Sequence, residues 1–143
     1  MNVEIKLAEG VICPAYATDG SIGLDLSVQQ DVILLANSTQ LIGSGVSLNI
    51  KDNNVGAFVY PRSGLGHKLG VVLGNLTGVI DSDFNGEIML SLWNRSENVA
   101  YLNKGDRVAQ LVFQPIIKPK LAVVNEFSGG TQRGGNGFGS TGV

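Results

Sequence analysis

The sequence has very few of the residues on which disulfide, thiol and zinc chemistry depend. Its 143 residues include one cysteine, Cys13, and one histidine, His67. A single cysteine excludes an internal disulfide and a zinc site built from several cysteines, and it is typical of a reduced compartment. A single histidine likewise excludes a mechanism that needs several of them. We therefore expect Cys13 to act as a small apolar residue and His67 to lie on the surface.

Charge and long apolar runs are also scarce. Charged residues make up 15% of the chain and the formal net charge is −2. This balance gives no electrostatic basis for direct binding of nucleic acid. No apolar run approaches the ~20 residues needed to cross a bilayer, and the N-terminus lacks the layout of a signal peptide. We expect an intracellular protein with no membrane partner, and the low charge also favours burial between subunits.

What the chain has in quantity is glycine, 20 residues that separate short apolar or alternating runs. Runs of this kind predict a single all-β domain of the sandwich or jelly-roll-like barrel type. One short helix is predicted near Ser63–Leu69. We expect a β-barrel over residues 1–127 and a flexible Gly-rich tail over residues 128–143. The runs that predict strands are 3–7, 24–28, 31–35, 39–42, 46–50, 55–60, 78–80, 87–93, 107–117 and 121–124.

The segment GNLTGVIDSDFNGEI, residues 74–88, carries the densest set of candidate functional groups. Asp81 and Asp83 would face the same side of a strand, and Asn85-Gly86 is a two-residue hairpin turn signal. Two carboxylates this close need water, a metal or a cation beside them. An ordinary surface turn is the alternative, since Asp, Asn and Gly are common in turns. An EF-hand loop is rejected, because its twelfth position would be Leu92 between predicted strands.

Two further motifs are suited to binding phosphate. In PRSGLG, residues 61–66, backbone N–H groups at Ser63 and Gly64 would form an anion site, and Arg62 would add charge-assisted hydrogen bonds. The alternative is a Ser63 N-cap beside an ordinary surface arginine. Gln110 would lie among apolar neighbours, where its amide needs a ligand or a backbone partner. Asp25, between two leucines on a strand, is by default a solvent-facing carboxylate.

The C-terminal tail contains one arginine, Arg133, and one aromatic residue, Phe138. A purely flexible tail needs neither, whereas a flap that closes over a flat ligand needs both. The GxGxxG spacing in this tail is a coincidence, because no βαβ unit surrounds it. Together with the phosphate motifs and the paired carboxylates, the tail predicts a phosphorylated ligand with a flat base, accompanied by Mg²⁺.

Five motifs, in order, resemble those of the trimeric dUTPase family, and they span nearly the whole chain. The resemblance, which is strongest to bacterial and phage members, implies a jelly-roll-like homotrimer with active sites between subunits. It implies Mg²⁺-dependent hydrolysis of dUTP to dUMP and pyrophosphate by in-line attack of water on the α-phosphorus, in the cytoplasm of the cell or of a phage host. This reaction limits uracil in DNA and supplies dUMP for dTMP synthesis. The motifs are SIGLDLS (21–27), PRSGLG (61–66), GNLTGVIDSDFNGEI (74–88), GDRVAQLVF (105–113) and RGGNGFGSTG (133–142).

The resemblance also implies a role for each matching residue. Asp81 would activate the water, Asp25 would belong to the Mg²⁺ environment through water, and Asp83 would orient its hairpin rather than take part in the chemistry. The residues that would contact uracil and deoxyribose are Asn75, Gly78, Val79, Ile80 and Phe84, with Phe138 stacking over the base. The residues that would contact the phosphates are Arg62, Ser63, Gly64, Gln110, Arg133, Gly139, Ser140 and Thr141.

Two residues depart from the family pattern, and two other functions stay open. Phe84 stands where tyrosine is usual, which predicts weaker discrimination against UTP. Ile22 stands where a small residue is usual, and its bulk would act on the strand that carries Asp25. A dCTP deaminase would share the fold, although the uracil-type hairpin and the Gly-rich tail argue against it. A regulatory protein that uses dUTP as a switch is the remaining alternative.

Overall fold

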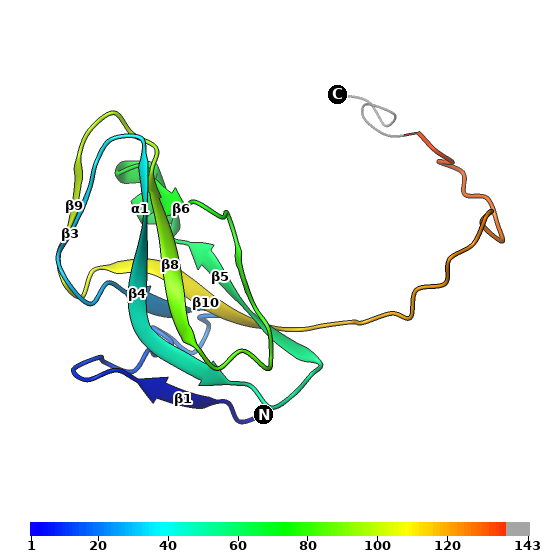
Figure 1. Ribbon diagram of the computed structural model, residues 1–143, viewed down its shortest axis with the longest axis horizontal. Coiled ribbons are helices and arrows are strands. Elements are labelled where there is room, and N and C mark those ends of the chain that lie inside the picture. The colour runs from blue at the N-terminus through cyan, green and yellow to red at the C-terminus, as the bar shows by residue number, and fades with distance from the viewer. Residues whose placement is uncertain (137–143) are drawn as a thin grey trace.

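The computed structural model describes residues 1–136, which form ten strands and one short helix (Figure 1). This confirms the all-β class and the single helix. The strands are β1 Glu4–Leu7, β2 Leu24–Ser27, β3 Val32–Leu34, β4 Ser38–Asn49, β5 Val55–Pro61, β6 Val71–Leu73, β7 Gly78–Ile80, β8 Glu87–Asn94, β9 Ala100–Leu102 and β10 Arg107–Pro115, and the helix is α1 Ser63–Lys68.

The strands form two four-stranded sheets and one two-stranded sheet, all antiparallel. The first sheet has the order β1-β4-β8-β6, the second β2-β10-β5-β7, and the third consists of β3 and β9. The core lies between them, because successive side chains of a strand point to opposite faces and the longer strands turn their apolar face inward. In β8, for example, Ile88, Leu90 and Leu92 are buried while Met89 is exposed. Burial of each such leucine contributes about 2 kcal/mol.

The structure differs from the predicted strands in two places: two predicted strands form one, and another predicted strand is absent. Residues 39–42 and 46–50 join in the single strand β4, where a register shift against β8 between Gly43 and Ser47 accommodates the glycines. Gly45 takes a φ of +70°, which favours glycine. The strand predicted at 121–124 is absent, because residues 116–136 carry no helix or strand and extend away from the sheets (Figure 1).

The hairpin predicted around Asn85-Gly86 is wrong, because its two flanking strands lie in different sheets. β7 pairs with β5, whereas β8 pairs with β4 and β6. The turn forms earlier, where the Phe84 N–H donates to the Asp81 carbonyl at 3.1 Å. The residues after this turn therefore cross from one sheet to the other, and the Asn85 amide ties the crossing to the Leu48 carbonyl at 3.0 Å.

Helix α1 follows β5 directly and begins after Arg62, which is its N-cap residue. The interpretation of Ser63 as the N-cap is therefore wrong, and Arg62 makes no side-chain cap hydrogen bond. Gly66 is buried where the helix packs on β6, and a Cβ there would lie 3.0 Å from a Val72 methyl group. His67 is exposed, as predicted. Within residues 1–136 no helix is long and apolar enough to cross a membrane.

Candidate active site

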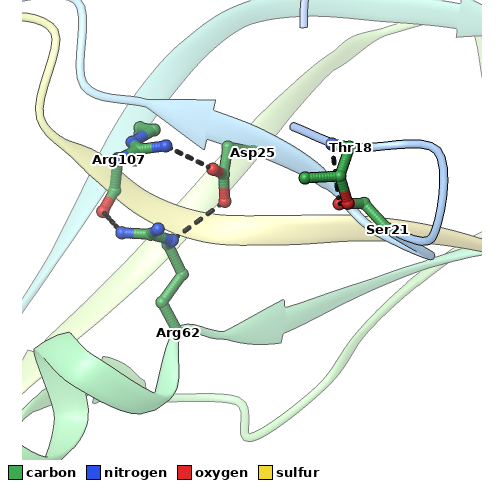
Figure 2. Close-up of polar contacts among 5 residues, drawn as sticks. All are labelled: Thr18, Ser21, Asp25, Arg62 and Arg107. Carbon is green, nitrogen blue, oxygen red and sulfur yellow. Dashed lines mark hydrogen bonds and ion pairs between the residues drawn. The ribbon is translucent and has the colours of Figure 1, made fainter. Parts of the chain in front are cut away.

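Three charged side chains meet where β2, β5 and β10 lie side by side (Figure 2). Asp25 Oδ1 accepts from Arg62 Nε at 2.8 Å, and Asp25 Oδ2 accepts from Arg107 Nη1 at 3.0 Å. Arg62 Nη1 also donates to the Arg107 carbonyl at 3.2 Å. The expectation of a solvent-facing Asp25 is therefore wrong: the side chain is 23% exposed and is held by two guanidinium groups. Arg62 is not an ordinary surface arginine.

A cavity of about 440 Å³ opens beside these charges, and we call it the Arg62 cavity. Gly64 lines it, and a Cβ at Gly64 would meet no protein atom within 4 Å. Packing within the chain therefore does not require glycine at this position. A ligand that approaches the backbone closely would require it. The first N–H groups of α1 are at this edge and have no partner within the helix. The cavity is lined by Ala17, Ser21, Ile22, Gly23, Asp25, Arg62, Ser63, Gly64 and Gln110.

Gln110 is fixed at the back of the Arg62 cavity by main-chain and packing contacts. Its Nε2 donates to the Pro61 carbonyl at 3.1 Å, which is the backbone partner that one interpretation of the sequence foresaw. Gly23 packs closely beside it, because a Cβ there would lie 2.9 Å from Gln110 Oε1 and would displace the amide. The Gln110 amide therefore lies at a defined position next to the turn that carries Arg62.

The loop before β2 closes the rim of the Arg62 cavity. Thr18 and Ser21 bond to each other through their hydroxyls at 3.0 Å, and the Ser21 N–H donates to the Thr18 carbonyl at 3.0 Å (Figure 2). Ile22 follows and is 77% exposed. It lines the Arg62 cavity, and Asp25 pairs with Gln110 in the register of β2 and β10. The effect of this larger side chain on β2 stays a prediction.

The segment from Gly74 to Ile80 forms a tight connection between β6 and β7. Leu76 takes a φ of +62°, and the Thr77 N–H donates to the Asn75 carbonyl at 2.7 Å. A Cβ at Gly78 would lie 3.1 Å from Val59 Cβ, so a larger residue would force β7 away from β5. Within residues 1–136 the Asn75 side chain makes no hydrogen bond, which leaves its amide available to a ligand.

Asp81 and Asp83 are exposed at the turn after β7. Among the described residues neither carboxylate has a hydrogen bond or an ion pair, so both are open to ligand or solvent. Phe84 is partly exposed beside them, with its ring over Gly86. Val79 is exposed and Ile80 packs against the core.

Within a single chain, Asp81 lies far from the Arg62 cavity. Ile80 pairs with Ala57, and β5 then runs in the opposite direction from β7 toward Arg62. From Ala57 to Arg62 the strand covers about 17 Å, and Asp81 lies beyond Ile80 on the far side. The predicted phosphate residues are therefore grouped at one end of β5, and the predicted catalytic residue stands at the other.

The predicted tail residues are only partly described. Arg133 is exposed, and its Nε donates to the Asn136 carbonyl at 2.9 Å. Phe138, Gly139, Ser140 and Thr141 lie outside the described residues. Their roles in the site therefore stay predictions.

The side chains fit a magnesium ion that is carried by phosphates and water, and they do not fit one held by the protein alone. Within residues 1–136 no three carboxylate, histidine or cysteine side chains come close enough to hold a metal. Asp25 has both oxygens in ion pairs, yet a carboxylate has further lone pairs that accept from water. Mg²⁺ keeps several waters and commonly binds substrate phosphates, so contact through water fits the chemistry of this residue.

Sequence reasoning missed Arg107 as a member of this charge cluster. The available signal was the pair of adjacent apolar residues Val108 and Ala109, which breaks the alternation of a regular strand. Both are buried, and β10 shifts its register against β2 between Arg107 and Ala109.

The fold and the Arg62 cavity define an antiparallel β-protein with a cationic, glycine-lined site suited to an anion. The sequence matches the family model described as dUTPase over residues 9–142, and the chain belongs to the dUTPase family. It is 46% identical over 145 residues to the deoxyuridine 5′-triphosphate nucleotidohydrolase of Buchnera aphidicola subsp. Schizaphis graminum, covering 100% of this chain and 91% of that protein.

Two solved phage structures are similar to this fold. The Staphylococcus bacteriophage 80alpha dUTPase with dUpNHpp has a TM-score of 0.88 and 26% identity, with 99% of each chain covered. A mutant dUTPase from phage phi11 of S. aureus, whose structure concerns the coordination of a structural Mg(II) ion, has a TM-score of 0.80 and 23% identity, covering 89% of this chain and 99% of that one.

Proposed function

We propose that the chain is a dUTP nucleotidohydrolase that converts dUTP and water to dUMP and pyrophosphate. The observation that carries the proposal is the Arg62 cavity in a chain that matches the dUTPase family over residues 9–142. Arg62 supplies charge, Gly64 allows close approach of the backbone, and Ser63 adds a hydroxyl to the same edge. This donor set suits a polyphosphate, which needs several directed N–H and O–H groups.

The reaction needs a base for water and a surface that selects deoxyuridine. Asp81 takes a proton from the attacking water, whose oxygen bonds to the α-phosphorus as the bond from that phosphorus to the bridging oxygen of pyrophosphate breaks. Asn75 reads the edge of uracil, and the tight backbone around Gly78, Val79 and Ile80 leaves no room for a 5-methyl group. Phe84 packs on the sugar. Gln110 and the tail residues Arg133, Phe138, Gly139, Ser140 and Thr141 complete the enclosure of the nucleotide.

A shared site between subunits follows from the separation of Asp81 from the Arg62 cavity. We propose a homotrimer in which Asp81 of one subunit meets the Arg62 cavity of a second, with the tail over residues 128–143 acting as a flap on the site. The outer face of β4 and β8 supports this assembly, because Leu41 and Met89 are exposed there. The arm after β10 also exposes Leu121 and Phe127, both at least 90% accessible and therefore available to another subunit.

We propose Mg²⁺ as the cofactor, reached by Asp25 through water. When bound to the triphosphate it neutralises part of the charge that develops during hydrolysis. The chain's own contribution is to hold Asp25 between Arg62 and Arg107. A reduced cytoplasm, of the cell or of a phage host, suits an exposed free thiol at Cys13 and is the compartment we propose.

Product analysis with purified protein and Mg²⁺ tests the function. Incubations with dUTP, dCTP, dTTP and UTP run in parallel, and we expect dUMP and pyrophosphate from dUTP. Asp81→Asn should abolish turnover while dUTP binding persists, because only the base is lost. Ammonia from dCTP would instead identify a deaminase. Absence of turnover with all four nucleotides would reject the enzyme, and nucleotide-dependent capture of a partner would then favour the regulatory alternative.

A further inference from the structure

We infer that Arg107 is a positioning residue for the phosphate-binding arginine, acting through Asp25 and through its own carbonyl group. The inference rests on the proposed function of the Arg62 cavity and adds a residue to it. Arg107 does not line that cavity; it lines a separate cavity of about 590 Å³ on the other side of Asp25. Its side chain is 56% exposed, so its role is not core packing.

A β-bulge directs Arg107 toward Asp25. In a regular strand residues 107 and 110 would point to opposite faces, because they are three positions apart. In β10 the extra residue Val108 shifts the register, so that Arg107 pairs with Ser27 and Gln110 pairs with Asp25. Ser27 and Asp25 are two apart and share one face of β2. The bulge thus puts Arg107 and Gln110 on the face of the sheet that carries Asp25, and both Val108 and Ala109 are buried.

Arg107 fixes Arg62 at two points. The Arg107 carbonyl accepts from Arg62 Nη1 at 3.2 Å, and Arg107 Nη1 holds Asp25, whose other oxygen accepts from Arg62 Nε at 2.8 Å. A guanidinium has five N–H donors in one plane. With two of its donors held by the protein, Arg62 presents the remaining donors to the cavity in a set orientation.

Arg107 also decides the charge that a polyphosphate meets. A lone Arg62–Asp25 pair would be neutral, and its carboxylate would repel phosphate oxygens. With Arg107 present, the three side chains carry one net positive charge. Asp25 can therefore orient Arg62 without cancelling the attraction between Arg62 and the phosphates.

A double-mutant cycle on the full chain tests this role, with the Kd for dUpNHpp as the readout. We expect Arg107→Gln to raise the Kd about tenfold or more, the effect of losing one charge-assisted hydrogen bond. In an Asp25→Asn background the same change should raise the Kd by a clearly smaller factor, because the anchor through Asp25 is already lost and only the charge of Arg107 remains to be removed. Arg107→Lys should restore part of the affinity by keeping the charge.

Three controls distinguish a positioning role of Arg107 from a general effect of charge, of nucleoside binding or of stability. Lys104→Gln removes one positive charge three residues away and should leave the Kd unchanged. Affinity for deoxyuridine, which has no phosphates, should not respond to Arg107→Gln, and neither should the melting temperature. An equal loss of dUpNHpp affinity in both backgrounds would overturn the inference, because Arg107 would then contact the phosphates directly.

The two proposals fail in different ways. The same cycle with tripolyphosphate as the probe needs no recognition of uracil and no turnover. If the wild-type chain does not hydrolyse dUTP but binds tripolyphosphate with the non-additive pattern, the proposed function is wrong and the role of Arg107 stands. If the chain hydrolyses dUTP and the two substitutions are additive, only the role of Arg107 is rejected.

Discussion

The Phe84 ring lies so close over Gly86 that a Cβ on Gly86 would be 2.6 Å from Phe84 Cζ. Real side chains do not approach this closely, so Gly86→Ala must displace the ring. Because Phe84 packs on the sugar in our proposal, we expect kcat/KM for dUTP to fall about 10- to 100-fold, the effect of an ångström-scale misplacement. Steady-state kinetics measure this. Gly20→Ala is the control, since a Cβ at Gly20 meets no atom within 4 Å, and a fall of the same size there would reject the explanation.

Phe84 also predicts how sharply the enzyme rejects UTP. The family usually has tyrosine at this position, and phenylalanine keeps the ring but lacks the hydroxyl. We expect Phe84→Tyr to increase the ratio of kcat/KM for dUTP to that for UTP by up to about tenfold, the value of one hydrogen bond. Competition assays with both nucleotides give this ratio directly. An unchanged ratio would show that the ring alone excludes the 2′-hydroxyl.

The proposed sharing of sites between subunits predicts complementation between two inactive variants. Asp81→Asn and Arg62→Gln should each be inactive alone, because each removes one half of every site. Chains mixed one to one and reassembled should recover about a quarter of wild-type turnover, since one site in four receives both intact residues. Activity is measured before and after mixed refolding. No recovery from mixed trimers would contradict the shared site.

Asn94 is predicted to be the polar side chain on which stability depends most. It is fully buried, and its Nδ2 donates to the carbonyls of Leu34, Leu35 and Asn98 at 3.1, 3.2 and 2.8 Å. Asn94→Ala removes a donor from all three carbonyls, of which that of Leu35 keeps a bond from the Ser38 hydroxyl at 2.7 Å and that of Asn98 one from the Ser96 hydroxyl at 3.0 Å. We expect a loss of about 3 kcal/mol in the free energy of unfolding. Urea denaturation measures the loss. Asn103→Ala, at an exposed turn, should cost less than about 0.5 kcal/mol.

Removal of the tail should separate folding from turnover. A chain that ends at Gln132 keeps every strand and the helix, because β10 ends at Pro115. We therefore expect its circular dichroism spectrum and its mass in solution, that of the proposed trimer, to match those of the full chain, while turnover of dUTP is greatly reduced. Sedimentation and kinetics on the same sample provide both readouts. Unfolding of the shortened chain would refute the flap interpretation.

The sequence was informative wherever a pattern reports on local structure. Alternation predicted β5, β8 and β10 within one or two residues, because each strand has one face in the core. It missed β6 and β9, which are only three residues long and have no alternation to detect. The predicted strand over 121–124 is apolar enough, but it lies in the arm after β10 and pairs with no strand of the described residues.

Sequence reasoning was weakest where two distant segments meet. The Asn85-Gly86 signal favoured a hairpin, yet glycine is needed there for the Phe84 ring and the flanking strands enter different sheets. Asp25 was expected to face solvent, because nothing local reveals that two arginines converge on it. The phosphate role of Arg62 could be inferred from the turn that carries it, whereas the roles of Asn75 and Asp81 came from motif resemblance alone.

Because of the bulge at Val108, the number of residues between Arg107 and Gln110 matters more than their identity. Deleting a single residue between Arg107 and Gln110 would leave these two side chains two positions apart on one face of a regular strand, with the loss of one buried apolar side chain. Inserting one residue while the bulge is kept would instead turn one of the two side chains to the opposite face. Substitution of Val108 by isoleucine or alanine would keep the spacing. Across descendants of this chain, we expect insertions and deletions to be excluded here while the identity of the bulged residue drifts.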